Sequence, residues 1–139
     1  MNYKRAIGIG VLVYFATMIV GIAVCSMLGI KPDITQPIPM TMWIVSAVLA
    51  VVLSVAGAYW YFLGKNLKPS LQAGLRFGAV MIAVGFVLDF IFFLTLSFEG
   101  HDPFAVMAGY YRQPMFWSTL ILILFGSGWM GQWMEKHKK

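Results

Sequence analysis

The chain has 139 residues, of which 60% are hydrophobic and 11% are charged. This composition excludes an ordinary water-soluble globular domain, because the polar side chains are too few to cover so much apolar surface. The net charge of +5 does not indicate a nucleic-acid-binding protein, since Lys and Arg lie in short segments between apolar runs rather than on one solvated face. One cysteine, Cys25, excludes an internal disulfide and a CxxC redox motif.

Four apolar runs are each long enough to cross a hydrocarbon core of roughly 30 Å as a helix. The segment after the first run contains Pro32, Pro37 and Pro39, which predict a loop because proline removes a backbone donor and disfavours helix in the residue before it. We therefore expect one all-α transmembrane domain over residues 1–139, folded as a four-helix bundle. The predicted spans are residues 6–30, 40–63, 71–98 and 115–134.

The two later connections carry helix-capping residues. Between the second and third runs, Gly64 suits a helix C-cap and Ser70 an N-cap. Before the fourth run, Asp102 stands at an N-cap position and Pro103 at the first helical position. A short interfacial helix over residues 103–111 is therefore predicted before the last span.

Basic and aromatic residues predict the orientation. If the N-terminus is cytoplasmic, that side carries eight Lys and Arg residues and the other side two, a bias that the positive-inside rule favours. We therefore predict a cell-membrane protein with both termini in the cytoplasm. The eight are Lys4, Arg5, Lys65, Lys68, Arg76, Lys136, Lys138 and Lys139, and the two are Lys31 and Arg112. The aromatic residues expected at the outer headgroup level are Trp43, Tyr110, Tyr111 and Trp117.

Asp89 is the one ionisable residue well inside a predicted span. Counted from Phe98 at about 1.5 Å per residue, it lies about 14 Å below the outer end, near the middle of the bilayer. An acid at that depth costs roughly 2.5 to 3.5 kcal/mol, so it should face protein or trapped water. Gly74, Gly78 and Gly85 share its helical face, and glycines let a neighbouring backbone approach closely. This pattern predicts that the third helix lies at the centre of the bundle.

Partners for Asp89 are expected at a similar depth. Tyr14 and Thr17 lie on one face of the first helix, and a hydroxyl from either could satisfy the carboxyl. Arg112 is the nearest plausible counter-charge if the short helix folds back over the mouth of the bundle. Arg76 lies 13 residues before Asp89 on the same helix, close to 20 Å away, which excludes direct pairing.

Two interpretations of Asp89 remain open. In one it is a proton or cation site, because a carboxyl in apolar surroundings can bind and release protons near neutral pH. In the other it is a protonated or hydrogen-bonded residue that determines helix packing. We favour the second from sequence, because proton relays generally use chains of titratable groups and Asp89 stands alone at its depth.

The outer loop offers a weaker candidate site. Glu99, His101 and Asp102 are of types that can bind a divalent metal, or act on lipid in a membrane enzyme. A solvated loop with a helix cap accounts for them better, so the sequence predicts neither a metal nor a cofactor. The glycine-rich segment at residues 126–131 lacks the Lys of a phosphate loop and is attributed to close helix packing.

Parts of the chain resemble a class of known sequences. The residues NYKRAI at 2–7 run straight into a span, and Gly74, Gly78 and Gly85 precede Leu88 and Asp89. This pattern resembles small four-span bacterial and archaeal membrane proteins classed as domains of unknown function. The resemblance implies a prokaryotic cytoplasmic membrane and supplies no activity. Small multidrug exporters also have four spans, but they are shorter and carry their essential glutamate in the first helix, which counts against drug–proton exchange here.

These observations lead to two functional predictions. The first is a non-enzymatic accessory, regulatory or structural membrane subunit, which would contact the lipid bilayer and either further copies of itself or a larger membrane protein. The alternative is a small proton- or cation-coupled transporter that uses Asp89.

Overall fold

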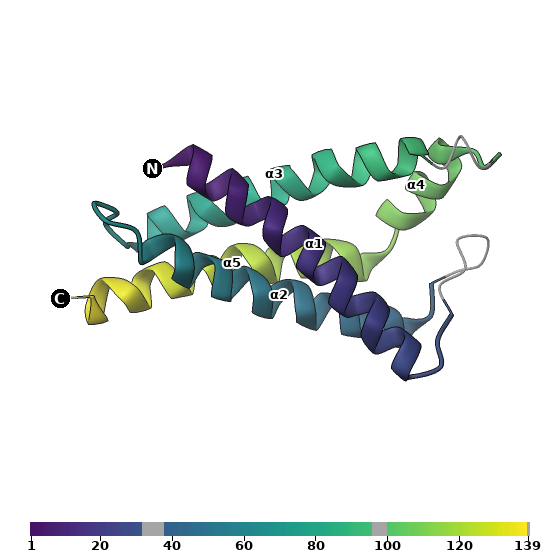
Figure 1. The fold of residues 1–139 in the computed structure, drawn as a ribbon, viewed down its shortest axis with the longest axis horizontal. Coiled ribbons are helices and arrows are strands. Elements are labelled where there is room, and N and C mark those ends of the chain that lie inside the picture. The colour runs from purple at the N-terminus through teal and green to yellow at the C-terminus, as the bar shows by residue number, and fades with distance from the viewer. Residues whose placement is uncertain (32–37, 96–99, 139) are drawn as a thin grey trace.

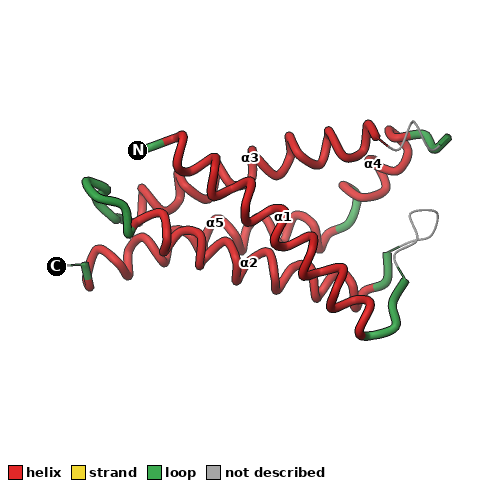
Figure 2. The backbone as a smooth tube through the Cα atoms, viewed as in Figure 1, coloured by secondary structure: helices red, strands yellow, loops and turns green. Residues whose placement is uncertain are grey.

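The computed structural model describes residues 1–31, 38–95 and 100–138. Figure 2 shows helices joined by loops throughout this part of the chain, without a strand. Four of the helices are long and apolar enough to cross a membrane. This confirms the predicted all-helical class and the predicted number of candidate spanning helices. The helices are α1 (Tyr3–Met27), α2 (Met40–Phe62), α3 (Leu71–Thr95), the short α4 (Pro103–Tyr111) and α5 (Pro114–His137).

The ends of the helices differ from the predicted spans by a few residues. α1 ends at Met27 instead of residue 30, because Gly29 adopts a left-handed φ of 73° and the Ile30 N–H donates to the Cys25 carbonyl. α5 starts at Pro114 and continues to His137, beyond the predicted residue 134. Residues 96–98, at the end of the predicted third span, lie outside the described residues.

Two predicted helix starts have the expected capping contacts. The Ser70 hydroxyl accepts a hydrogen bond from the Ala73 N–H at 3.1 Å, ahead of α3. The Asp102 carboxylate accepts one from the Phe104 N–H at 3.0 Å and begins α4. Each bond satisfies an amide that the first helical turn leaves without a partner.

The turn between α2 and α3 differs from the prediction at Gly64. The left-handed residue of this turn is Asn66, with a φ of 65°, and the C-cap residue of α2 is Leu63. A Cβ atom at Gly64 would lie 2.9 Å from Cδ1 of Leu67 and 3.1 Å from the guanidinium carbon of Arg5, both at the ends of flexible side chains that can move aside.

Each long helix packs mainly against two others (Figure 1). α1 contacts α2 and α3, α5 contacts the same two helices, and the α3–α5 contact is the most extensive. The prediction that the third helix lies at the centre is therefore wrong, because α3 is one of four helices arranged around shared interior space. α4 packs against α3 and α5 near the end that lies away from the termini.

Glycines make the α3–α5 contact close. A Cβ atom added at Gly74 would lie 2.3 Å from the Ser127 carbonyl oxygen, and one at Gly131 would lie 2.4 Å from the Ser70 carbonyl oxygen. At Gly78 the nearest atom would be the Leu124 Cα, at 3.2 Å. Small residues of this kind let helix backbones approach when lipid surrounds both helices and burial of apolar surface from water supplies no attraction.

The tightest packing lies toward the termini. The side chains of this cluster come from α1, α2, α3 and α5 and make mainly apolar contacts. The Tyr61 hydroxyl also accepts a hydrogen bond from the Asn2 N–H at 2.9 Å. This half therefore holds the helices together. The buried residues are Ala6, Ile9, Ala58, Tyr61, Phe62, Phe77, Met81 and Met134.

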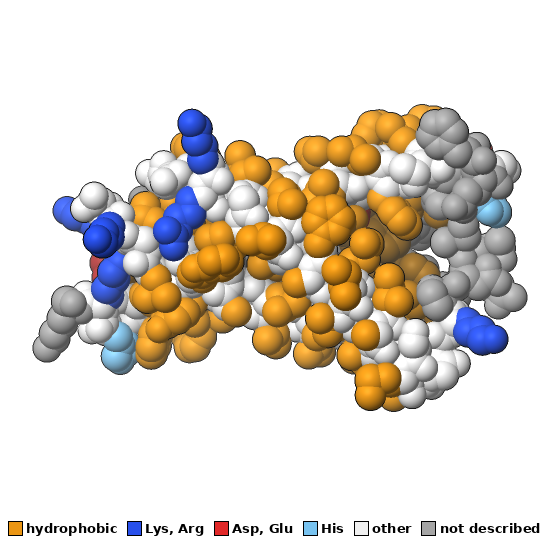
Figure 3. Space-filling view, viewed as in Figure 1, with side chains coloured by type: hydrophobic (Ala, Val, Ile, Leu, Met, Phe, Trp, Pro, Cys, Tyr) orange, Lys and Arg blue, Asp and Glu red, His pale blue; other side chains and the backbone are white. Residues whose placement is uncertain are grey.

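Both termini lie at the same end of the molecule (Figure 1). In Figure 3 most of the visible Lys and Arg side chains gather at that end, whereas orange apolar side chains cover the face between the two ends. Large apolar residues are exposed along all four long helices, among them Ile19, Val52, Val87 and Phe125. An apolar surface of this extent is expected to contact lipid instead of water.

Two cationic side chains bind the carbonyl end of α2. Lys138 Nζ donates to the carbonyl oxygen of Phe62 and, at 3.3 Å, to that of Gly64. The Arg5 guanidinium donates to the Trp60 carbonyl oxygen at 2.8 Å. The last carbonyls of a helix have no partner within the helix and carry partial negative charge, so cations stabilise them.

Replacing Lys138 with Gln is therefore expected to lower the free energy of unfolding by about 1 kcal/mol. Unfolding by SDS, followed by circular dichroism, would measure the change. Lys136→Gln is the matched control, because Lys136 is exposed in the last turn of α5 and no contact with α2 is seen for it in the described structure. Equal losses from the two variants would contradict a specific role for Lys138.

Candidate functional site

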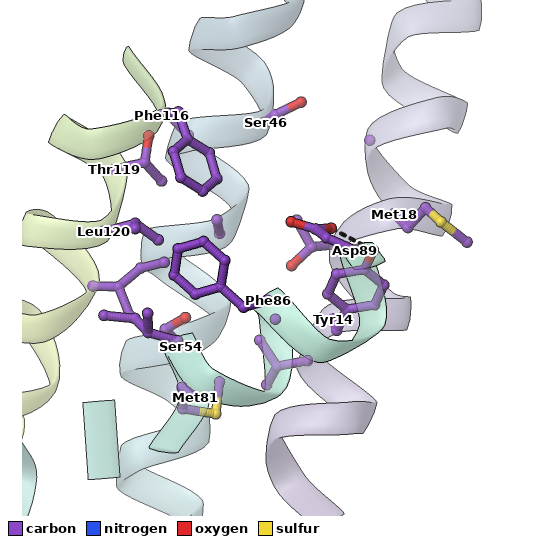
Figure 4. A pocket seen from close by; sticks show the side chains of 18 of the residues that line it. Tyr14, Met18, Ser46, Ser54, Met81, Phe86, Asp89, Phe116, Thr119 and Leu120 are labelled. Carbon is purple, nitrogen blue, oxygen red and sulfur yellow. Dashed lines mark hydrogen bonds between the residues drawn. The ribbon is translucent and has the colours of Figure 1, made fainter. Parts of the chain in front are cut away.

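A cavity of about 290 Å³ lies between the four long helices, in the half of the molecule away from the termini. Figure 4 shows the side chains that surround it. Most are apolar, and each of the four long helices contributes to the lining, with Tyr110 added from α4. Asp89 is the one charged residue among the described residues that line it.

Asp89 lies on α3, six residues before the end of the helix at Thr95. The predicted depth of Asp89 counts from Phe98, which lies outside the described residues, so this depth stays a prediction. The Tyr14 hydroxyl of α1 donates to Oδ1 of Asp89 at 2.6 Å (Figure 4). Of the two hydroxyls predicted as partners, Tyr14 thus makes the bond, while Thr17 lines the cavity.

The predicted counter-charge for Asp89 is absent from the cavity. Arg112 follows α4 as its C-cap residue and is exposed, and no ion pair with Asp89 is found in the described part of the chain. α4 does lie beside α3 as supposed, but it presents the Tyr110 ring to the cavity. Burying a guanidinium among apolar side chains costs more free energy than leaving it in water. This cost explains why Arg112 lies outside the cavity.

Hydroxyl groups are spread around the cavity, and among the described residues only that of Tyr14 donates to the Asp89 carboxyl. Figure 4 shows Ser46, Ser54 and Thr119 apart from the carboxyl, with Tyr14 next to it. The Thr119 hydroxyl already donates to the Met115 carbonyl oxygen at 2.7 Å within its own helix. Among the described residues, Tyr14 is the one hydrogen-bond donor to Asp89.

Aromatic rings form the wall of the cavity near α4. The Phe86 and Phe116 ring centres are 5.8 Å apart, those of Tyr110 and Phe116 5.1 Å, and those of Trp43 and Tyr110 5.1 Å. Burial, and secondly the nearby Asp89, raises the pKa of Tyr110, so its phenol is neutral at pH 7.

The sequence did not predict this wall. Trp43 and Tyr110 were expected at the headgroup level, but the Trp43 side chain is 7% exposed and packs on Tyr110. A periodic signal existed on α3, because Phe86 and Asp89 are three residues apart and so share one helical face.

The cavity reaches the surface beside α1. The two helices α1 and α3 approach closely at Gly10, where a Cβ atom would lie 3.4 Å from the side chains of Met81 and Val84. Beyond this point they diverge (Figure 1), and Figure 3 shows the same face hollowed toward the end away from the termini. Met18 and Ile22 of α1 line the cavity and are 37% and 47% exposed. In a membrane this opening would face lipid.

The glycine face of α3 divides into two parts. Gly74 and Gly78 contact α5, whereas a Cβ atom at Gly85 would have no atom within 4 Å. Gly85 lines the cavity instead. The expectation that all three glycines bring a neighbouring backbone close is therefore wrong at Gly85, because α3 borders open space there.

The outer-loop candidates are only partly described. Glu99 lies outside the described residues. His101 is half-buried, and the Asp102 carboxylate is engaged with the N-terminus of α4. In the part of the chain that the structure describes, no three His, Cys, Asp or Glu residues are placed to hold a metal ion.

No protein-family model, curated protein or solved structure matches this chain. The resemblance to small four-span prokaryotic proteins therefore remains a prediction.

Proposed function

We propose that this chain is an integral protein of a prokaryotic cytoplasmic membrane, with a bundle of four spanning helices and both termini in the cytoplasm. The common end of the two termini supports this orientation, as does the excess of Lys and Arg at that end. α4 then lies at the outer surface, beside the mouth of the cavity.

We further propose that the protein is a small carrier in which Asp89 binds a proton or a cation. The observation that carries this proposal is that Asp89 lines a cavity with Tyr14 as its donor and without a cationic partner among the described residues. A carboxylate in apolar surroundings is costly unless it is paired, so it favours either a proton or a bound cation.

This geometry reverses the preference drawn from sequence. A carboxyl whose sole role is to hold helices together is expected to be enclosed by the helices that it joins, whereas Asp89 bonds to Tyr14 of α1 and also borders a cavity. The exposed apolar faces are also compatible with an accessory subunit that binds another membrane protein or further copies of itself. These faces do not favour that role, because lipid would cover them equally well. Stoichiometric recovery of another membrane protein with this one from mild detergent would favour the accessory role.

The test is cation-dependent proton movement in proteoliposomes, measured with a pH-sensitive dye inside the vesicles. Asp89→Asn is expected to reduce the protein-dependent rate about tenfold or more, because the amide can hold neither a proton nor a counter-charge at neutral pH. Glu135→Gln is the matched control, since Glu135 is exposed near the other end of α5. Equal rates for Asp89→Asn and the unmodified protein would overturn the carrier proposal.

A further inference from the structure

The oxygen atoms around Asp89 are too few for a bare metal cation. Ca²⁺ takes about six to eight oxygen ligands and Mg²⁺ about six. The Tyr14 hydroxyl bonds to the Asp89 carboxyl, and Thr17 and Tyr110 add hydroxyls to the cavity lining, which still leaves fewer than six ligands. Ser46, Ser54 and Thr119 lie elsewhere around the cavity (Figure 4). An inorganic ion would have to keep most of its water shell in a mainly apolar space, which is unfavourable.

The aromatic wall favours an organic cation instead. Phe86 extends from α3 on the same side as Asp89, and Phe116 lies beyond it (Figure 4). An ammonium group held near an aromatic face is attracted by its electron-rich ring, and the attached apolar body can pack against the remaining rings. Phe86 and Asp89 therefore offer complementary contacts to the two parts of one ligand.

The carboxyl has one oxygen available for a donor. Tyr14 occupies Oδ1, and Oδ2 accepts no hydrogen bond from the described residues. A ligand N–H can donate to Oδ2, which a quaternary ammonium cannot do. The cavity volume, about 290 Å³, is at the lower limit of the roughly 300 to 1,000 Å³ found for small-molecule sites, so the ligand is small.

We propose that the cavity binds a small protonated amine with an aromatic body, its N–H group on Asp89 and its ring against Phe86 and Phe116. This proposal rests on the proposed function in taking Asp89 as the cation site. The amine enters from the bilayer through the opening between α1 and α3, where the apolar side chains of Met18 and Ile22 border the cavity. A protonated aromatic amine partitions at the membrane interface.

The experiment is equilibrium binding of radiolabelled 1-naphthylmethylamine to the protein in lipid nanodiscs, with empty nanodiscs subtracted. The neutral analogue 1-naphthylmethanol has nearly the same shape and lacks the charge. We expect saturable binding of the amine, with an affinity at least about tenfold higher than that of the alcohol. Asp89→Asn should lower the affinity for the amine about tenfold and leave the affinity for the alcohol little changed.

Matched variants separate the site from the lipid-facing surface. Phe86→Ala should weaken the amine several-fold, whereas Phe125→Ala should not, because Phe125 is 65% exposed on α5 and does not line the cavity. Glu135→Gln serves as the charge control. Equal binding by Asp89→Asn and the unmodified protein, or equal binding of amine and alcohol, would show simple partition into lipid and overturn the proposal.

The same variants distinguish this proposal from the carrier function. Asp89-dependent proton movement driven by Na⁺ or K⁺, without saturable amine binding, would overturn the amine proposal and leave the carrier intact. Saturable, Asp89-dependent amine binding, without proton movement driven by Na⁺, K⁺ or the amine itself, would support the amine site and overturn the carrier. Absence of both proton movement and saturable amine binding in the unmodified protein would reject both proposals.

Discussion

Gly74→Val is expected to prevent the protein from reaching its folded state in detergent or lipid. The first added carbon would already lie 2.3 Å from the Ser127 carbonyl oxygen and 2.9 Å from the Gly128 Cα. Both are backbone atoms, so no side chain can rotate away, and α3 and α5 have to separate along their whole contact. We expect a loss of at least about 3 kcal/mol in the free energy of unfolding.

Size-exclusion chromatography and SDS unfolding would measure the effect of Gly74→Val. Gly85→Ala is the matched control on the same helix, since a Cβ atom there would meet nothing within 4 Å. This control should be neutral or stabilising by about 1 kcal/mol, because Ala is the better helix former. A folded Gly74→Val protein of unchanged stability would show that α3 and α5 do not approach as described.

Tyr14→Phe is expected to destabilise the protein by about 1 to 2 kcal/mol at neutral pH. The substitution removes the hydroxyl that donates to Asp89 at 2.6 Å and retains the ring. Hydrogen bonds between membrane helices are worth less than 1 kcal/mol on average and up to about 1.7 kcal/mol. The short distance of 2.6 Å places the Tyr14–Asp89 bond at the upper end of that range. SDS unfolding of the purified variant would measure the loss.

A double-mutant cycle tests whether this loss comes from the bond between Tyr14 and Asp89. In an Asp89→Leu background Tyr14→Phe should have almost no effect, since the acceptor is gone. Ser118→Ala is a suitable control for loss of a hydroxyl, because the Ser118 hydroxyl bonds to the Pro114 carbonyl oxygen within α5 and is exposed. Additive effects of Tyr14→Phe and Asp89→Leu would show that the two side chains do not interact.

The Tyr14–Asp89 bond also connects packing with the proposed function. It joins α1 and α3 on the cavity side of their close contact at Gly10, beyond which the two helices diverge. A cation on Asp89 would contact the carboxyl that holds these two helices at the opening. Occupancy of the site and the width of the opening are therefore expected to be coupled.

Much of the architecture follows from the sequence alone. Apolar runs of membrane-spanning length, together with the caps at Ser70 and Asp102, predict the long helices and the short α4, because these signals act within one segment. Asp89 and its donor Tyr14 could also be identified as candidates, since a lone acid in an apolar run needs a polar neighbour.

The tertiary structure alone decided what surrounds Asp89. Helical period places Gly85 and Asp89 on one face, but it does not say whether that face meets a neighbouring helix or open space. The crossing of α1 and α3 at Gly10 and the glycine contact of α3 with α5 determine where the four helices separate. Both contacts are made between residues far apart in the chain, so a local sequence pattern does not predict them. They place Asp89 at the edge of a cavity as well as in a bond between two helices.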